Sequence, residues 1–190
     1  MSQSPMPQKG LLAVILAGFM LISHAVTAEM ASQHHFELPS ESYVQNAFDG
    51  VTPVTKRVWI RGVLKQQIES ILQHKTSILR VKYWQVGDRS VWILDEIGKD
   101  KLITTGLTLS YRAGVSSIVN IKVLAYRESR GWEVKYSFFT DQFVGAQLKP
   151  EKIKLNKTID GITGATLSVR ALTKVAQIAL LLDQHVRKEK

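Results

Sequence analysis

The sequence predicts an α+β domain in which an antiparallel sheet of about four or more strands is flanked by an N-terminal helix and a long C-terminal helix. Three observations support this fold class. Apolar residues recur at helical spacing before residue 73, strand-like segments joined by short turns occupy residues 78–126, and an apolar helical segment follows Thr166. Short links between consecutive strands favour antiparallel pairing.

The first predicted element is an amphipathic helix of about five turns that begins near Pro53. Its apolar stripe is expected to pack on a sheet, and no chemistry is needed to explain it. The stripe comprises Ile60, Val63, Leu64, Ile68, Ile71 and Leu72. The opposite face carries Arg57, Arg61, Lys65, Gln66, Glu69 and Gln73.

Four strands are predicted next. Ile78 to Tyr83 and Val91 to Leu94 form a hairpin around Gly87-Asp88, Gly98-Lys99-Asp100 turns the chain into Leu102 to Leu109, and Ser117 to Tyr126 is the fourth strand. Trp84 and Trp92 are expected to pack across strands, although a pair of this kind could also bracket a ring system.

The segment from Phe138 to Leu148 suits a short helix or an irregular covering element, with its aromatic residues Phe138, Phe139 and Phe143 in the core. A long helix then begins at Thr166. Its body is rich in Ala, Val and Leu, so it should be largely buried. A polar stripe on this helix comprises Arg170, Lys174, Gln177 and Gln184.

The N-terminus has the order of parts of a signal peptide. Lys9 precedes an apolar run from Leu11 to Ile22, and small residues lead to Ala28. We expect residues 1–28 to be the signal peptide and residues 29–190 to form a single domain with a flexible N-terminal tail, in the periplasm or otherwise outside the cytoplasm. An uncleaved segment that anchors the protein in the membrane is the alternative.

Composition narrows the function further. The chain has no cysteine, which excludes thiolate-ligated iron–sulfur clusters and the usual attachment of c-type haem. The sequence predicts no metal site. The formal net charge is +9, but the basic residues are scattered and export separates the chain from nucleic acid. An anionic membrane surface or an acidic redox partner is a more plausible target, and simple solubility is the plain alternative.

The segment Asp160 to Ser168 carries the candidate chemistry. Asp160 and Gly161 suit a tight turn, and Thr163 is predicted to cap the following helix. Gly164 and Ala165 leave the backbone bare, so that a phosphate can approach the free N–H groups of the first turn beside the Thr166 hydroxyl. A capped helix N-terminus without a ligand explains the same residues.

The string Asp-Gly-x-Thr-Gly-Ala-Thr at residues 160–166 resembles the flavinylation motif of the FMN-binding domain family, which includes subunits of sodium-translocating NADH:quinone reductase and of Rnf electron-transport complexes. The resemblance implies that Thr166 bonds through its oxygen to the phosphate of FMN. It also implies that an FAD:protein FMN transferase installs the group from FAD with a divalent metal and releases AMP.

A second, partial resemblance covers Glu128-Ser129-Arg130-Gly131-Trp132, where the family has Glu-Ser/Thr-Pro-Gly-x-Gly. Arg130 replaces the proline, and Glu133 replaces the second glycine. The resemblance implies that Glu128, Ser129 and Gly131 lie beside the flavin ring, that Trp132 stacks on it and that Arg130 stabilises the reduced ring. A solvent-exposed turn is the alternative for Arg130-Gly131.

These resemblances predict an exported flavoprotein that relays electrons between a membrane reductase or cytochrome and an extracytoplasmic acceptor. Two alternatives stay open. One is a sensory or structural module that binds phosphate or flavin without a covalent bond. The other is a small extracytoplasmic flavin reductase, although the chain lacks the Gly-x-Gly-x-x-Gly fingerprint of dinucleotide binding.

Overall fold

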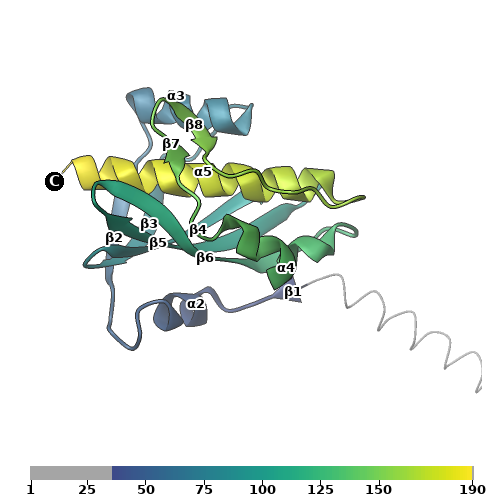
Figure 1. The fold of residues 1–190 in the computed structure, drawn as a ribbon, viewed down its shortest axis with the longest axis horizontal. Coiled ribbons are helices and arrows are strands. Elements are labelled where there is room, and N and C mark those ends of the chain that lie inside the picture. The colour runs from purple at the N-terminus through teal and green to yellow at the C-terminus, as the bar shows by residue number, and fades with distance from the viewer. Residues whose placement is uncertain (1–35, 190) are drawn as a thin grey trace, which may run out of the picture.

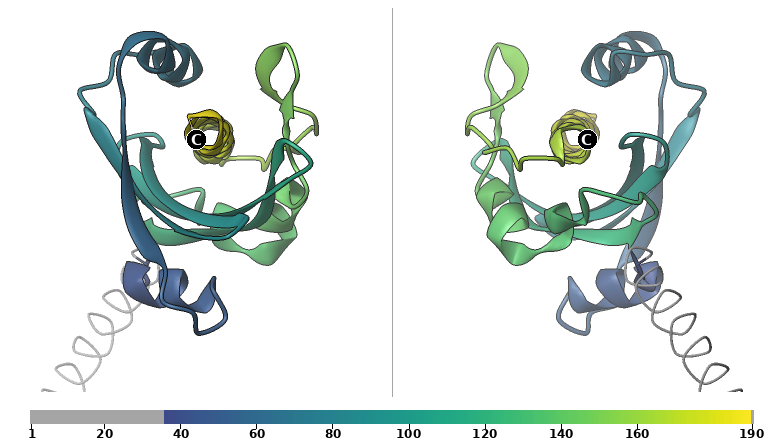
Figure 2. Two further views of the ribbon diagram at one scale, coloured as in Figure 1. Left: turned by 90° about the vertical axis from the view of Figure 1, so that its left-hand side faces the viewer. Right: turned by 90° about the vertical axis from the view of Figure 1, so that its right-hand side faces the viewer.

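A curved antiparallel sheet wraps around one long helix in the computed structural model, which describes residues 36–189 (Figures 1 and 2). The sheet has six strands in the order β1-β6-β5-β4-β3-β2. The strands are β1 (Phe36–Glu37), β2 (Val54–Trp59), β3 (Arg80–Val86), β4 (Arg89–Ile97), β5 (Leu102–Arg112) and β6 (Val115–Tyr126). The predicted α+β class is therefore confirmed. The predicted signal peptide and tail, residues 1–35, lie outside the described residues.

The remaining elements lie on the two faces and one end of this sheet. The helices are α2 (Ser40–Asn46), α3 (Gly62–Leu72), η1 (Trp132–Lys135), α4 (Ser137–Thr140), η2 (Asp141–Phe143) and α5 (Thr166–Lys188). Strands β7 (Leu148–Lys149) and β8 (Lys152–Leu155) form a separate hairpin. Among residues 36–189, no helix has the length and apolarity needed to cross a membrane.

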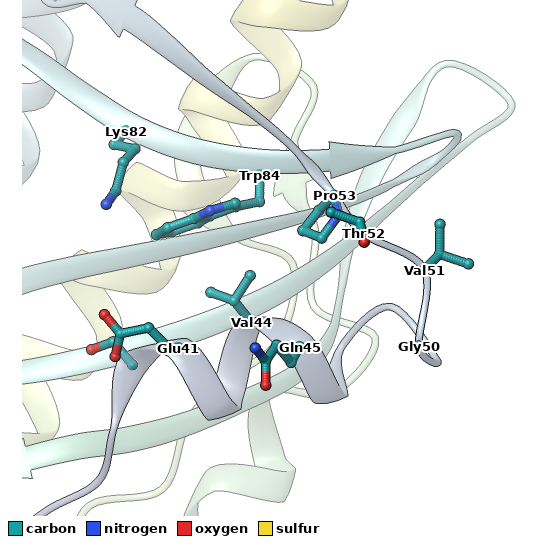
Figure 3. A pocket seen from close by; sticks show the side chains of 10 residues that line it. Glu41, Val44, Gln45, Gly50, Val51, Thr52, Pro53, Lys82 and Trp84 are labelled. Carbon is teal, nitrogen blue, oxygen red and sulfur yellow. The ribbon is translucent and has the colours of Figure 1, made fainter.

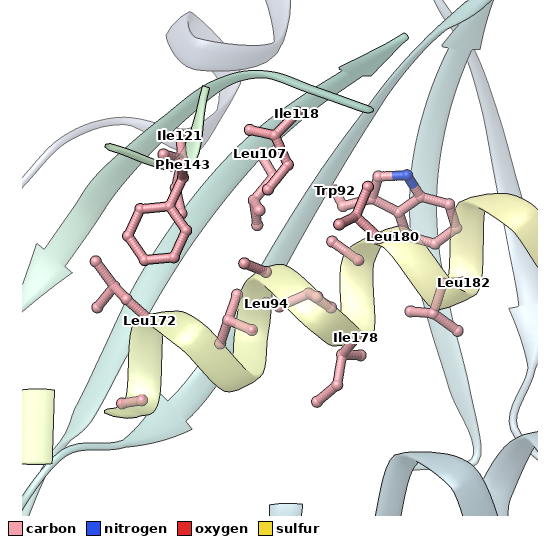
Figure 4. Packing of buried hydrophobic residues seen from close by; sticks show 14 of the residues in the cluster. Trp92, Leu94, Leu107, Ile118, Ile121, Phe143, Leu172, Ile178, Leu180 and Leu182 are labelled. Carbon is pink, nitrogen blue, oxygen red and sulfur yellow. The ribbon is translucent and has the colours of Figure 1, made fainter. Parts of the chain in front are cut away.

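The concave face of the sheet holds α5, as the prediction of a largely buried C-terminal helix requires (Figure 2). Leu172, Leu180 and Leu182 of this helix are fully buried against the inner side chains of the strands, which include Trp92 and Leu107 (Figure 4). Burial of such side chains contributes roughly 1.5–3 kcal/mol each. The main core therefore lies between α5 and the sheet, and it fixes where α5 begins and ends.

The prediction of a helix from Pro53 was wrong. Residues Val54–Trp59 form strand β2, which pairs along its length with β3, and the helix begins only at Gly62. The β-branched residues of this segment favour a strand, and helical spacing alone concealed that preference. Val63 was assigned to the apolar stripe but is exposed, whereas Leu64 and Ile68 are buried as predicted. The short strand β1 and helix α2 were not predicted.

The predicted hairpin and meander are confirmed as β3, β4, β5 and β6, each paired antiparallel to the next. Tyr83 is the cross-strand partner of Trp92, and their rings stack with centroids 4.4 Å apart. Because Trp84 follows Tyr83 in the strand, it points to the opposite face of the sheet from Trp92. The two tryptophans therefore cannot bracket one ring system.

The covering segment after β6 was predicted in part. Phe139 and Phe143 are fully buried and meet edge to face, with centroids 5.6 Å apart. Phe138, which was also assigned to the core, is exposed, and so is Val144. A helical turn at α4 followed by a 3₁₀ turn at η2 points alternate side chains outward, which explains the difference.

A buried carboxylate ties the C-terminal half of α5 to the sheet. Asp183 is completely buried and accepts hydrogen bonds at 2.6 Å from the hydroxyls of Ser90 on β4 and Ser116 on β6. The indole N–H of Trp92 donates to Ser90 in turn, at 3.0 Å. Arg187 lies one turn further along, with its Nε 3.7 Å from Asp183. A charge buried this deeply needs such partners.

Candidate cofactor site

The segment that precedes α5 forms a tight turn, but not where the sequence predicted it. The N–H of Ala165 donates to the carbonyl of Ile162 at 3.0 Å, so Thr163 and Gly164 are the central residues of the turn. Gly164 has a φ of 82°, a conformation that glycine adopts at little cost. Asp160 and Gly161, the predicted turn residues, lie outside this turn and have no regular structure.

The prediction that Thr163 caps the helix was also wrong. The N-cap residue is Ala165, and no side chain caps the first turn of α5. Thr163 lies two residues before the N-cap residue Ala165, so its hydroxyl does not serve the N–H groups of the first turn. These groups therefore stay available to an anion approaching the helix N-terminus.

Thr166 is the first residue of α5, and it is exposed. Within residues 36–189, no side chain hydrogen-bonds its hydroxyl. Gly161 and Gly164 face open space, since a methyl group added at either residue would meet no atom within 4 Å. The exposed hydroxyl, bare backbone and uncapped N–H groups together fit a phosphate ester at Thr166.

Ala165 has a different role from the one predicted. It is buried rather than bare, and its Cα lies 3.3 Å from the position that a Cβ on Gly131 would occupy. That Cβ would also lie only 2.9 Å from Oγ of Ser168. The close approach shows that the two segments with family resemblance, around Gly131 and around Thr166, pack against each other.

Tyr126 joins the same two segments through its hydroxyl. The hydroxyl donates to the carbonyl of Arg130, and it lies 3.0 Å from Oγ of Ser168. Burial raises the pKa of Tyr126, so the hydroxyl keeps its proton and remains a donor. On the other side of the motif, the N–H of Asp160 donates to Oε1 of Gln142 at 2.7 Å. The start of α5 is thus held from two directions.

Gly131→Ala tests this packing. We expect the variant to lose about 1–3 kcal/mol of unfolding free energy, because the new methyl group would push against Ser168 and Ala165, and to carry less flavin than wild type. Gly114→Ala is the matched control. Gly114 has a similar φ of 83°, but a methyl group there meets no atom within 4 Å. Urea unfolding of both variants separates the effect of the steric contact from that of backbone strain. Equal losses of unfolding free energy in the two variants would contradict the close packing at Gly131.

Glu128 has a structural contact that the sequence did not suggest. Its side chain is buried, and Oε1 accepts hydrogen bonds from three consecutive backbone N–H groups at 2.6, 2.8 and 2.9 Å. The donors are Lys99, Asp100 and Lys101, in the turn between β4 and β5. This carboxylate therefore holds the turn. Its neighbours Ser129 and Arg130 are exposed, as in the alternative of a solvent-exposed turn.

Aromatic side chains gather around Lys135 next to Gly131. The ring of Trp132 meets that of Tyr136 edge to face, with centroids 5.5 Å apart, and the ammonium of Lys135 lies within 6 Å of both. Phe138 continues the cluster on its exposed side. Sequence reasoning identified Trp132 but not Tyr136 or Lys135, because residues four apart come together only once the chain turns at η1.

One hollow lies away from the helix N-terminus, and a groove reaches close to it. The hollow, of about 530 Å³, separates α2 from the convex face of the sheet, with Val44, Lys82 and Trp84 among its walls (Figure 3), and it includes no residue of the motif. The groove, of about 920 Å³, runs between α3, β8 and α5. It includes Ile159, just before the motif, and Arg170, one helical turn after Thr166.

A known family model covers the segments around Gly131 and Thr166. Residues 103–181 match the family model described as the FMN-binding domain. The match runs from β5 to α5, so it includes both the Gly131 segment and Thr166. No curated protein matches the chain. The match supports FMN as the cofactor and a flavin-binding electron-transfer module as the broad function of residues 103–181.

Proposed function

We propose that this protein is an exported electron-transfer flavoprotein that carries FMN through a phosphoester to Thr166. The observation that carries the proposal is the exposed Thr166 hydroxyl at an uncapped helix N-terminus inside an FMN-binding domain. The match of residues 103–181 to the FMN-binding domain model supports FMN binding. The covalent bond, the export and the redox partners are the proposed part.

The helix N-terminus suits the phosphate for electrostatic reasons. The free N–H groups and the aligned peptide dipoles place partial positive charge there, and each favourable charge interaction contributes about 0.3–1 kcal/mol. Gly164 leaves room for the phosphate oxygens because it has no side chain. Asp160 and Gly161 complete the loop, and the Gln142 contact holds its backbone in place.

Attachment needs a separate enzyme. The Thr166 oxygen would form a bond to the FMN phosphorus of FAD, the diphosphate bridge would break, AMP would leave, and the hydroxyl proton would pass to a base. A threonine hydroxyl is a weak nucleophile without such a base. Within residues 36–189, no side chain hydrogen-bonds this hydroxyl. We therefore assign its activation to an FAD:protein FMN transferase.

The bound flavin supplies the capacity to accept and release one or two electrons. The residues of this chain position and enclose it. Gly131 and Trp132 lie on the segment that packs against the start of α5, and the exposed Arg130 is available to anionic charge on the reduced ring. A membrane reductase or cytochrome would supply the electrons, and an extracytoplasmic acceptor would receive them.

Coexpression with and without the transferase tests this proposal. We expect exported protein from cells that contain the transferase to stay yellow after denaturation, and protein from cells that lack it to be folded but colourless. The fold needs no flavin to bury its core, so circular dichroism should match between the two samples. Flavin that is released on denaturation would instead favour the non-covalent module.

A further inference from the structure

A second surface lies at the opposite end of α5 from Thr166. There a hollow of about 420 Å³ forms between β2, the start of α3 and the last turns of α5. Arg57, Trp59, Arg61 and Val63 line it on one side, and we call these four residues the arginine corner. His185 of α5 and Glu189, the residue after this helix, line the other side.

Large apolar side chains are unusually exposed at this corner. Trp59 is 55% exposed and Val63 is 69% exposed. Leu79, which is 67% exposed, lies beside them because its carbonyl accepts the N–H of Ile60 at 2.8 Å. Exposed apolar residues are unremarkable one at a time, but a group of them marks an interaction surface.

The basic residues around the corner also lack nearby acidic partners within the part of the chain that the structure describes. Arg57 lies directly across from Lys82 in the pairing of β2 with β3, and like charges in that position destabilise a sheet. Trp59 lies across from Arg80, whose guanidinium is 5.9 Å from the indole centroid. In the described part of the chain, Arg57, Lys82 and Arg80 form no ion pair with a carboxylate.

The acidic residue that lines this hollow lies next to a histidine. Oε1 of Glu189 is 3.1 Å from the imidazole of His185, and no ion pair joins Glu189 to Arg57 or Arg61 among the described residues. The corner therefore presents basic groups without acidic partners next to apolar groups without a cover.

We infer that the arginine corner binds the surface of an anionic phospholipid membrane. Guanidinium groups match phosphate oxygens with paired hydrogen bonds. Tryptophan, with an apolar body and a polar N–H, is favoured at the level of lipid headgroups. Basic groups alone would suit an acidic protein equally well, but exposed Trp59, Val63 and Leu79 add the apolar surface that partitions into a membrane interface.

Membrane binding through the arginine corner would fix the orientation of the flavin relative to the membrane. Thr166 and His185 lie on one helix, and a rise of about 1.5 Å per residue separates them by roughly 28 Å along its axis. With the corner on the membrane, Thr166 points away from the lipid. This orientation of the flavin rests on the proposed function, whereas lipid binding does not.

The test uses the unmodified chain from residue 29, without flavin, and vesicles of phosphatidylcholine with or without phosphatidylglycerol. We expect co-sedimentation with the anionic vesicles alone, weakening as salt is added. Arg57→Glu with Arg61→Glu should lower the apparent affinity by about 30-fold or more, and Trp59→Ala should lower it further. Lys152→Glu with Lys154→Glu on β8 is the matched control, because it changes the net charge equally.

The Lys152→Glu, Lys154→Glu control should bind anionic vesicles with an affinity within about threefold of wild type, since β8 lies away from the corner. Equal loss in both double variants would overturn the proposal, because net charge alone would then explain binding. It would also be overturned if the wild-type chain ignored anionic vesicles but bound an acidic protein through Arg57 and Arg61. Circular dichroism confirms that each variant is folded, and none of these results depends on flavin attachment.

Discussion

Thr166→Val should abolish covalent flavin while leaving the fold intact. Valine has nearly the shape of threonine but lacks the oxygen that forms the phosphoester. Thr166 is exposed and makes no side-chain hydrogen bond within the described residues, so the free energy of unfolding should change by less than about 0.5 kcal/mol. Protein coexpressed with the transferase and exported is measured by intact mass and by absorbance after denaturation.

Thr163→Ala is the control that separates attachment from turn chemistry. Thr163 lies in the same turn and carries the same hydroxyl, but it does not cap α5. We therefore expect near wild-type flavin content and a stability change within about 0.5 kcal/mol. A colourless Thr163→Ala variant combined with a yellow Thr166→Val variant would reverse the assignment of the acceptor oxygen.

Asp183→Ala should be the most destabilising change outside the site, costing about 3–5 kcal/mol. Removal of the carboxylate leaves the hydroxyls of Ser90 and Ser116 without their acceptor, and it opens a cavity beneath α5. Urea unfolding of the protein without flavin measures the loss directly.

The Glu189→Gln variant is the control for Asp183→Ala, because it removes the charge of an exposed carboxylate instead of a buried one. Glu189, the C-cap residue of α5, lies 3.1 Å from His185, but its side chain is 65% exposed, so water screens the interaction between them. The expected cost is below about 1 kcal/mol. Similar losses in the two variants would show that the Asp183 network contributes no more than a surface ion pair.

The strands after residue 78 could be predicted because two independent signals agreed there. Alternating apolar residues and the turn pairs, such as Gly87-Asp88, pointed to the same hairpins. Before residue 62 these signals conflicted. Ile60 falls on the helical stripe of Leu64 and Ile68, yet its own segment follows a strand. The spacing of Ile60, Leu64 and Ile68 therefore could not show where the strand ended and the helix began.

The sequence predicted a set of candidate site residues but not how the folded chain arranges them. Gly131 and Ala165 are far apart in the sequence, and only the folded chain shows that they touch. Thr163 looked like a cap because threonine often serves that role. The helix start at Thr166 was predicted correctly, but the backbone turn at Thr163 and Gly164 that precedes it was not. Glu128 was assigned to the site from the sequence, and its contacts with the turn after β4 depend on the tertiary fold.

The central claim is tested most directly by locating the flavin on one peptide. Trypsin cleaves after Lys157 and Arg170, so the peptide of residues 158–170 carries Thr158, Thr163, Thr166 and Ser168 together. Tandem mass spectrometry of this peptide, from exported protein made with the transferase, reports which oxygen is modified. We predict the mass of FMN less one water on Thr166. The same mass on Thr158, Thr163 or Ser168, or an unmodified peptide from yellow protein, would contradict the account.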